Sequence, residues 1–71
     1  MSAKVTFISS YPIRLGQFLK LVNAVQDGLE AKIWLHDGLV RVNGEIEIRR
    51  GRKLHKNDIV ELVDGTKYVL Q

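Results

Sequence analysis

Apolar residues follow two different spacings in the first third of the chain. Residues 4–8 (Lys-Val-Thr-Phe-Ile) are mostly of strand-favouring kinds, which predicts a short N-terminal strand. The Ser-Ser-Tyr-Pro sequence that follows ends this pattern. From Leu15 onward, apolar residues recur at intervals of three and four, which predicts a helix with one buried face. The residues on this face are Leu15, Phe18, Leu19, Val22 and Val25.

A second helix is predicted to begin after Asp27. The Asp27 carboxylate can accept a hydrogen bond from a free amide of the first turn, and Glu30, three residues later, can reach back in a capping box. Trp34 and Leu35 give this helix an apolar side. Gly38 is well suited to its C-terminal turn.

Residues 39–48 predict a β-hairpin around an Asn-Gly pair. A two-residue loop would set Val42 opposite Glu45 and would mix apolar and charged residues on both faces of the hairpin. A three-residue loop, residues 42–44, sets Arg41 opposite Glu45 and separates apolar from charged side chains. The three-residue loop is therefore the predicted register.

Two further strands are predicted after the hairpin. Residues 56–58 (Lys-Asn-Asp) indicate a turn, residues 59–63 a strand, and an Asp-Gly pair the turn before a closing strand over residues 67–70. A strand, two helices and then a small, mostly antiparallel sheet define the α+β class. With 71 residues, the chain is expected to form one domain, residues 1–71.

The basic charge of the chain is concentrated in one segment. The 11 lysines and arginines outnumber the 8 acidic residues, which gives a net charge of +3. Residues 49–56 (RRGRKLHK) contain five positive residues and no acid, so the other 63 residues carry a net charge of −2. Such a segment raises the local potential and attracts phosphates. It predicts a basic binding face with an acidic back.

Several chemistries find no support in the sequence. The chain has no cysteine, and His36 and His55 lie 19 positions apart, so no metal and no cofactor are expected. No phosphate-binding glycine loop, nucleophile elbow or Cys-His pair occurs, so neither enzyme activity nor a small-molecule substrate is expected. Without a segment apolar enough for a signal peptide or a membrane span, no membrane partner and a cytoplasmic location are expected.

Several segments together resemble the S-four RNA-binding domain. These segments are RLGQFL (14–19), EAK (30–32), GLVRVNG (38–44) and Lys53-Leu54 with Asp58. The similarity runs from about residue 13 to residue 62, and QFLKL and RRGRKL are similar to the free-standing, single-domain YaaA-like bacterial members. The resemblance implies a helix pair joined to a hairpin, the alpha-L motif. It also implies binding to structured ribosomal or transfer RNA, on the ribosome or its precursors.

Three basic residues match positions of this motif. Arg14 matches the arginine that opens the first helix, and Lys32 matches the first of two basic residues in the second helix. Arg41 matches the basic residue between the two valines of the hairpin. The resemblance thus implies that these three side chains contact RNA.

Three other positions depart from the motif. Gly16 stands where many members have aspartate, and Ile33 replaces the second basic residue of the second helix. Asn57 replaces the usual glycine of a Pro-Gly-Asp turn, which asparagine tolerates because it adopts left-handed backbone geometry more readily than most residues. The dense basic segment is expected to compensate for the missing positive charge at Ile33.

Arginine suits RNA binding because its planar fork can hold a phosphate with two hydrogen bonds. The three arginines of residues 49–52 are expected to converge on one RNA backbone around a flexible Gly51. Glu45 and Glu47 are expected to be exposed charge partners on one face of a strand. The full set of residues predicted to contact RNA is Arg14, Lys20, Lys32, Arg41, Arg49, Arg50, Arg52, Lys53 and Lys56.

Aromatic residues do not interleave with the basic segment, and Phe18 and Trp34 fit a core better than a stacking platform. Recognition of folded RNA through shape and phosphates is therefore expected. Two other functions stay open. One is a protein–protein adaptor that uses the basic loop. The other is a ubiquitin-like sulphur carrier, which residues 42–45 and 59–61 resemble, although the chain ends in Val-Leu-Gln where such carriers have Gly-Gly.

Overall fold

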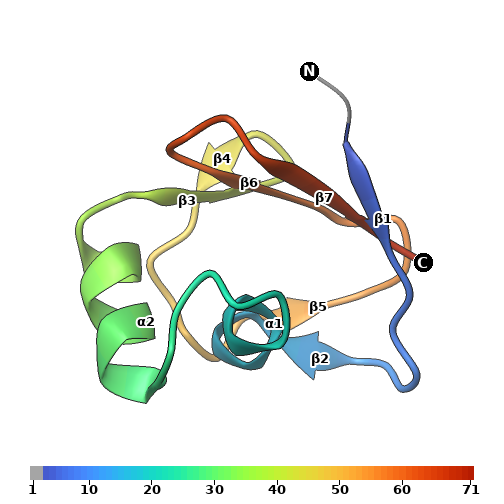
Figure 1. The fold of residues 1–71 in the computed structure, drawn as a ribbon, viewed down its shortest axis with the longest axis horizontal. Coiled ribbons are helices and arrows are strands. Elements are labelled where there is room, and N and C mark those ends of the chain that lie inside the picture. The colour runs from blue at the N-terminus through green and yellow to red at the C-terminus, as the bar shows by residue number, and fades with distance from the viewer. Residues whose placement is uncertain (1–2) are drawn as a thin grey trace.

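The computed structural model describes residues 3–71, and this range contains two α-helices and seven β-strands (Figure 1). The helices are α1 (Leu15–Leu21) and α2 (Gly28–His36). The strands are β1 (Lys4–Thr6), β2 (Ile13–Arg14), β3 (Val40–Val42), β4 (Glu45–Ile46), β5 (Lys53–Leu54), β6 (Ile59–Leu62) and β7 (Lys67–Leu70). The predicted α+β class is confirmed.

Most of the strands of the described range form one sheet with the order β1-β7-β6-β3-β4. Its neighbouring strands are antiparallel except β1 and β7, which run parallel. The predicted, mostly antiparallel sheet is therefore confirmed. The sequence did not predict the separate antiparallel ribbon of β2 and β5, in which Arg14 pairs with Lys53. In Figure 1, this ribbon and α1 lie below the sheet, and α2 closes one side.

The core lies between the sheet and the two helices. Leu15, Phe18 and Leu19 are fully buried on α1, as their spacing predicted, and Leu35 of α2 joins them. Phe18 meets Tyr68 of β7 edge to face, with ring centroids 5.6 Å apart. The remaining buried apolar residues are Val25, Ala31, Val40, Val42, Leu54, Val60, Leu62 and Leu70. Trp34 is partly buried against this core, so Phe18 and Trp34 have the packing role that the sequence predicted.

Both helices end in a left-handed residue. Gly38 (φ 72°) closes α2, and its amide and that of Leu39 bond back to carbonyls of the last turn. Asn23 (φ 61°) closes α1 in the same way, so the helix ends at Leu21 and the sequence prediction, which continued it to Val25, was too long. Neither helix of the described range is long and apolar enough to cross a membrane.

The start of α2 follows the sequence prediction. The Asp27 carboxylate accepts a hydrogen bond from the Glu30 amide at 2.8 Å, which satisfies one of the free donors of the first turn. The Glu30 carboxylate in turn accepts from the Gln26 amide at 2.7 Å, one residue before the cap. This local hydrogen bonding fixes where α2 begins.

The predicted register of the hairpin was wrong. Arg41 pairs with Ile46 and Val42 with Glu45, so the loop has two residues. Asn43 (φ 52°) and Gly44 (φ 87°) are both left-handed, as the tight primed turn of an Asn-Gly pair requires. The prediction assumed that both hairpin strands have a buried face, but β4 is a two-residue edge strand whose residues are exposed. Turn geometry therefore decides the register.

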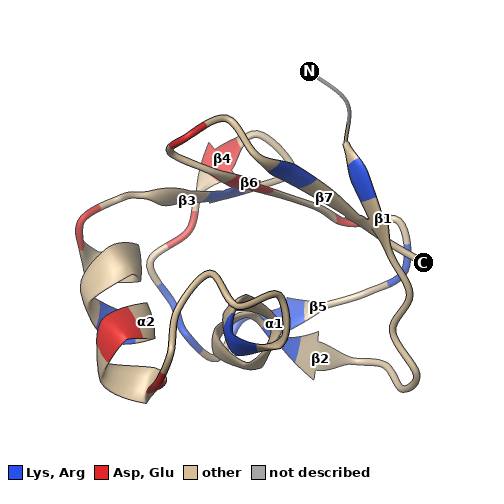
Figure 2. Ribbon diagram, in the orientation of Figure 1, with Lys and Arg blue, Asp and Glu red and all other residues tan. Residues whose placement is uncertain are grey.

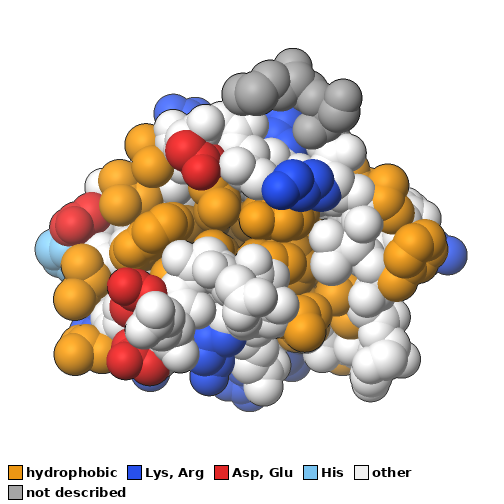
Figure 3. Space-filling view, viewed as in Figure 1, with side chains coloured by type: hydrophobic (Ala, Val, Ile, Leu, Met, Phe, Trp, Pro, Cys, Tyr) orange, Lys and Arg blue, Asp and Glu red, His pale blue; other side chains and the backbone are white. Residues whose placement is uncertain are grey.

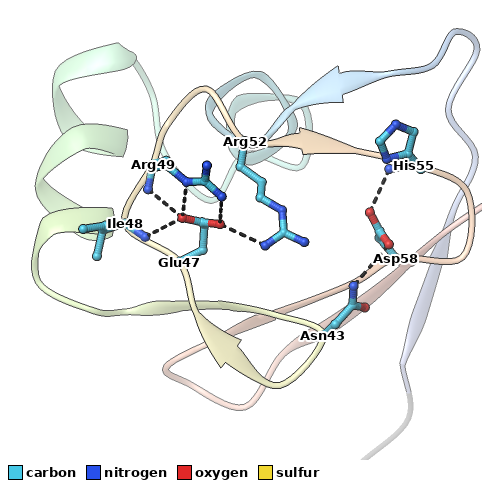
Figure 4. Close-up of polar contacts among 7 residues, drawn as sticks. All are labelled: Asn43, Glu47, Ile48, Arg49, Arg52, His55 and Asp58. Atoms are coloured by element: carbon cyan, nitrogen blue, oxygen red, sulfur yellow. Dashed lines mark hydrogen bonds and ion pairs between the residues drawn. The ribbon is translucent and has the colours of Figure 1, made fainter.

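Asn43 also joins the hairpin to the turn before β6. Its side-chain amide donates to the Asp58 carboxylate at 3.2 Å, and its side-chain oxygen accepts from the Ile59 amide at 2.9 Å. The other Asp58 oxygen accepts from the His55 amide at 2.8 Å (Figure 4). Between them, Asn57 is left-handed (φ 76°), which confirms the geometry predicted for this asparagine. The motif residues Asn43 and Asp58 are thus structural partners.

Candidate nucleic-acid interface

The basic loop, defined here as residues 49–52, lies across the first turn of α1. The amides of Leu15 and Gly16 donate to the carbonyls of Arg52 and Arg50, at 2.8 and 2.9 Å. The loop therefore satisfies two of the amides that a helix leaves free at its start. Directly after the loop, Lys53 and Leu54 pair with Arg14 and Ile13 in the β2–β5 ribbon. The flexible loop expected around Gly51 is instead a hydrogen-bonded turn on α1.

Gly16 allows the basic loop to approach α1 this closely. A Cβ atom at this position would overlap the Cγ atom of Arg50. Glycine is otherwise a poor residue for a helix, costing about 1 kcal/mol relative to alanine. A larger residue at position 16 would therefore displace Arg50.

Three basic side chains surround a hollow of about 170 Å³ at the start of α1. Arg14 and Lys20 lie on one side with Gln17, at three-residue intervals along one helix face. Arg50 lies on the other side, where its Nη1 donates to the Gly28 carbonyl of α2 at 3.2 Å. The lining is completed by Gly16, Gly28 and Gly51.

A second hollow lies next to the first. It is lined by Arg49, Arg52 and Lys53 and shares Gly51 with the hollow at α1. Six basic residues from β2, α1, the basic loop and β5 thus line two neighbouring hollows, which together we call the basic surface. Its residues are Arg14, Lys20, Arg49, Arg50, Arg52 and Lys53. Lys and Arg of these elements gather around α1 and β5 in Figure 2.

The structure places the other three predicted residues differently. Lys32 is exposed on α2, one helical turn after Gly28, and so flanks the basic surface. Arg41 lies on the outer face of the sheet opposite Glu61, and its Nη1 donates to the Gly44 carbonyl at 3.4 Å. Lys56 is exposed in the connection between β5 and β6. Arg41 and Lys56 line neither of the two hollows.

Glu47 is an acidic residue bonded to two arginines of the basic surface. It is 6% exposed, although the sequence predicted an exposed strand residue, and it follows β4 rather than belonging to it. The guanidinium groups of Arg49 and Arg52 both point to its carboxylate (Figure 4). These two arginines therefore converge on Glu47, and only Arg50 of the three reaches toward α2. The predicted role of Glu47 as an arginine partner is confirmed, whereas its predicted exposure was wrong.

Three acidic residues lie within or beside the basic surface. Glu47 lies inside it, and Asp27 and Glu30 lie at the start of α2, next to Gly28. In Figure 3, acidic side chains over the start of α2 lie beside Lys and Arg side chains over α1. The predicted acidic back is therefore incomplete, because folding places Glu47 among the arginines. Glu45, Glu61 and Asp64 lie in β4, β6 and the turn after β6, on the sheet and away from α1 (Figure 2).

Hydrogen bonds from Arg49, together with those from Arg52, lower the pKa of Glu47 from 4.5 to about 2. Folding thus favours the ionised form, so this stabilisation is present above about pH 4.5 and is lost as the pH falls toward 2. We expect Glu47→Gln to be less stable than the parent near neutral pH. The difference between the two free energies of unfolding should become smaller in acid, as measured by urea unfolding at several pH values between about 6 and 2.5. A difference that stays constant over this pH range would show that ionisation of Glu47 does not stabilise the fold.

A two-helix motif, a hairpin behind it and a basic loop against the first helix define a known class of domain. The chain belongs to the S4 domain family, whose family model matches residues 7–71. It is also 49% identical over 55 residues to the probable ribosome maturation protein RlbA of Bacillus subtilis (strain 168), an alignment that covers 78% of each chain. The resemblance on which the sequence prediction relied is therefore confirmed.

Gln17, Gly28 and Glu47 contribute to the basic surface but were not predicted as site residues. Gln17 and Gly28 line the first hollow, and Glu47 binds two of the arginines. Gln17 shares the helical spacing of Arg14 and Lys20, which was a usable sequence signal. Glu47 stands two residues before Arg49, but this spacing alone does not distinguish an exposed carboxylate from a buried one.

Proposed function

We propose that this chain is a non-catalytic RNA-binding module that docks on structured RNA through the basic surface. The observation that carries the proposal is the assembly of six basic residues from separate elements around two neighbouring hollows that share Gly51. Membership of the S4 domain family supports it. The contacting residues proposed are those of the basic surface together with Lys32.

The chemistry of the surface favours phosphate groups. Arginine and lysine side chains supply several donors each, and arginine can bind a phosphate with two parallel hydrogen bonds. The first hollow, about 170 Å³ and lined by three of these side chains, has room for a phosphate group of an RNA backbone. Phe18 is buried and Trp34 packs against the core, so neither offers a ring on which bases could stack. These features favour recognition of RNA shape and backbone.

The cellular role is proposed from the relative. RlbA of Bacillus subtilis is named as a probable ribosome maturation protein, and its alignment covers most of both chains. We therefore propose that the RNA is ribosomal RNA within an assembling ribosome, with transfer RNA as the alternative to be tested.

Salt dependence tests the electrostatic part of this proposal. If about five phosphates are contacted, the affinity for purified ribosomal RNA should fall with salt with a log–log slope of about −3.5 to −4.5. Filter binding at several salt concentrations gives this slope, and transfer RNA assayed in parallel tests the choice of RNA. A flat profile would contradict binding through the basic surface. Protein partners that persist in pull-downs after nuclease treatment would instead support an adaptor.

A further inference from the structure

Glu47 is an acidic residue beneath two arginines of a surface proposed to bind a polyanion, where its negative charge would by itself oppose the phosphates. We propose that Glu47 is a positioning residue, which holds the basic loop and two of its guanidinium groups in the conformation that RNA binds. This inference rests on the proposed function and identifies how the same site is prepared for its ligand.

The carboxylate binds both the backbone and the side chains of the segment that follows it. Oε2 accepts from the amides of Ile48 and Arg49, both at 3.0 Å, which sets the direction of the chain after β4. Oε2 and Oε1 then accept from Nε and Nη2 of Arg49, at 3.1 and 3.2 Å. Oε1 also accepts from Nη1 of Arg52, at 2.9 Å. A single side chain therefore fixes two amides and two arginines.

These bonds leave donors of both arginines available to a ligand. Nη1 of Arg49, together with Nε and Nη2 of Arg52, takes no part in the bonds to Glu47. The Arg49 side chain is 71% exposed and that of Arg52 is 32% exposed, whereas that of Glu47 is 8% exposed. The carboxylate thus lies beneath the two guanidinium groups, which keep one side toward solvent.

Ordering these side chains before RNA arrives lowers the cost of binding. Immobilising a flexible side chain at an interface opposes association, and arginine is among the residues with the most rotamer freedom to lose. The carbonyls of the same loop already bond to α1, so Glu47 extends this order from the backbone to the side chains. The pKa of Glu47, lowered to about 2, agrees with a carboxylate that stays ionised in this role.

A second explanation of Glu47 predicts the opposite effect on RNA affinity, so one experiment can distinguish the two explanations. If Glu47 only reduces the positive potential of the surface, its neutralisation should strengthen RNA binding, because fewer negative charges oppose the phosphates. If Glu47 positions the arginines, its neutralisation should weaken binding in spite of the added positive charge. A glutamine keeps the size of the side chain, but its NH₂ group faces arginine donors and cannot accept from them.

The experiment compares Glu47→Gln with Glu45→Gln in filter binding to purified ribosomal RNA at one low salt concentration. Glu45 is the matched control because it is an exposed residue of the adjacent strand and its substitution changes the net charge equally. We expect Glu47→Gln to bind about tenfold more weakly than the parent, since two arginines must then be ordered by the RNA. Glu45→Gln should bind as tightly as the parent or more tightly. Affinity of Glu47→Gln equal to or above that of the parent would overturn the proposal.

Arg49→Lys is a second test that does not depend on how well Glu47→Gln folds. Arg49→Lys keeps the charge but loses the two-point contact with Glu47, and we expect it to bind RNA more weakly. Combined with Glu47→Gln, it should add little further loss, because both changes release the same arginine. Fully additive losses would overturn the proposal, and circular dichroism of each variant identifies the folded ones. Absence of RNA binding by the parent chain is a separate result, which would refute the proposed function itself.

Discussion

Reversing the charge of Arg14, Lys20 and Arg50 together is expected to abolish measurable RNA binding. These three side chains line the hollow at the start of α1, and none of them forms a salt bridge within residues 3–71. Each phosphate that is no longer bound should lower the salt slope by about one, and the introduced carboxylates repel the backbone as well. We expect the affinity for ribosomal RNA to fall by at least about 100-fold in filter binding.

The matched control reverses three lysines elsewhere on the molecule. Lys4, Lys56 and Lys67 line neither hollow of the basic surface, and their reversal changes the net charge by the same amount. This variant should retain most of its affinity at moderate salt, where charges more than about 10 Å apart are largely screened. An equal loss in both variants would mean that binding depends on overall charge and not on the basic surface. Circular dichroism and thermal unfolding of both variants separate binding losses from misfolding.

Reversing all three arginines of the basic loop would be a less specific test of RNA binding. Arg49 and Arg52 neutralise Glu47, so acidic residues in their places would leave a buried carboxylate facing two further negative charges. The loss of binding in such a variant could not be separated from unfolding of the loop. Arg50 is the arginine of the loop whose charge can be reversed without affecting Glu47, because its guanidinium contacts a carbonyl of α2.

Replacing Asp58 with alanine is expected to lower the free energy of unfolding by about 2 kcal/mol. The Asp58 carboxylate accepts from the His55 amide and from the side chain of Asn43, and each hydrogen bond contributes about 0.5–1.5 kcal/mol net. A domain of 71 residues has a total stability of only about 4–10 kcal/mol. Urea unfolding of the parent and the variant measures the difference.

Asp64→Ala is the matched control for this prediction. Asp64 is also an exposed aspartate in a turn next to β6, but its Oδ1 accepts from the Thr66 amide at 2.9 Å within the same turn. Asp64→Ala should therefore lower the free energy of unfolding by less than Asp58→Ala, because Asp58 joins the hairpin to the turn before β6. Asn43→Ala combined with Asp58→Ala should cost less than the sum of the two single changes, because they share a hydrogen bond. Additive costs would show that the two side chains act independently.

The features that the sequence predicted correctly are those fixed by neighbouring residues. The start of α2 at Asp27, its end at Gly38 and the buried face of α1 each depend on residues within one or two turns. The two-residue strands β2 and β5 are too short to produce a recognisable pattern, and their pairing depends on the folded arrangement around α1. The hairpin register failed because the separation of faces was given more weight than the turn.

For the candidate site too, the sequence predicted what depends on neighbouring residues and missed what depends on the folded arrangement. The sequence identified most of the basic surface, because positive charge is concentrated in residues 49–56 and because Arg14 matches the motif. It also included Arg41 and Lys56, which line neither hollow, and the fold places Arg41 on the sheet opposite Glu61. It also treated Glu47 as an ordinary exposed carboxylate. Neither the burial of one glutamate nor the close approach of Arg50 to Gly16 follows from spacing along the chain.

The pairing of β1 with β7 has a consequence for the order in which the molecule folds. Lys4 pairs with Tyr68, so nearly the whole described chain must be closed into a loop before this ladder can form. β1 adds little burial in return, since Lys4 and Val5 are exposed, and it is an edge strand. We therefore expect β1 to dock last and its amides to exchange with solvent first. The basic surface, built on α1 and the β2–β5 ribbon, can be complete while that strand is still open.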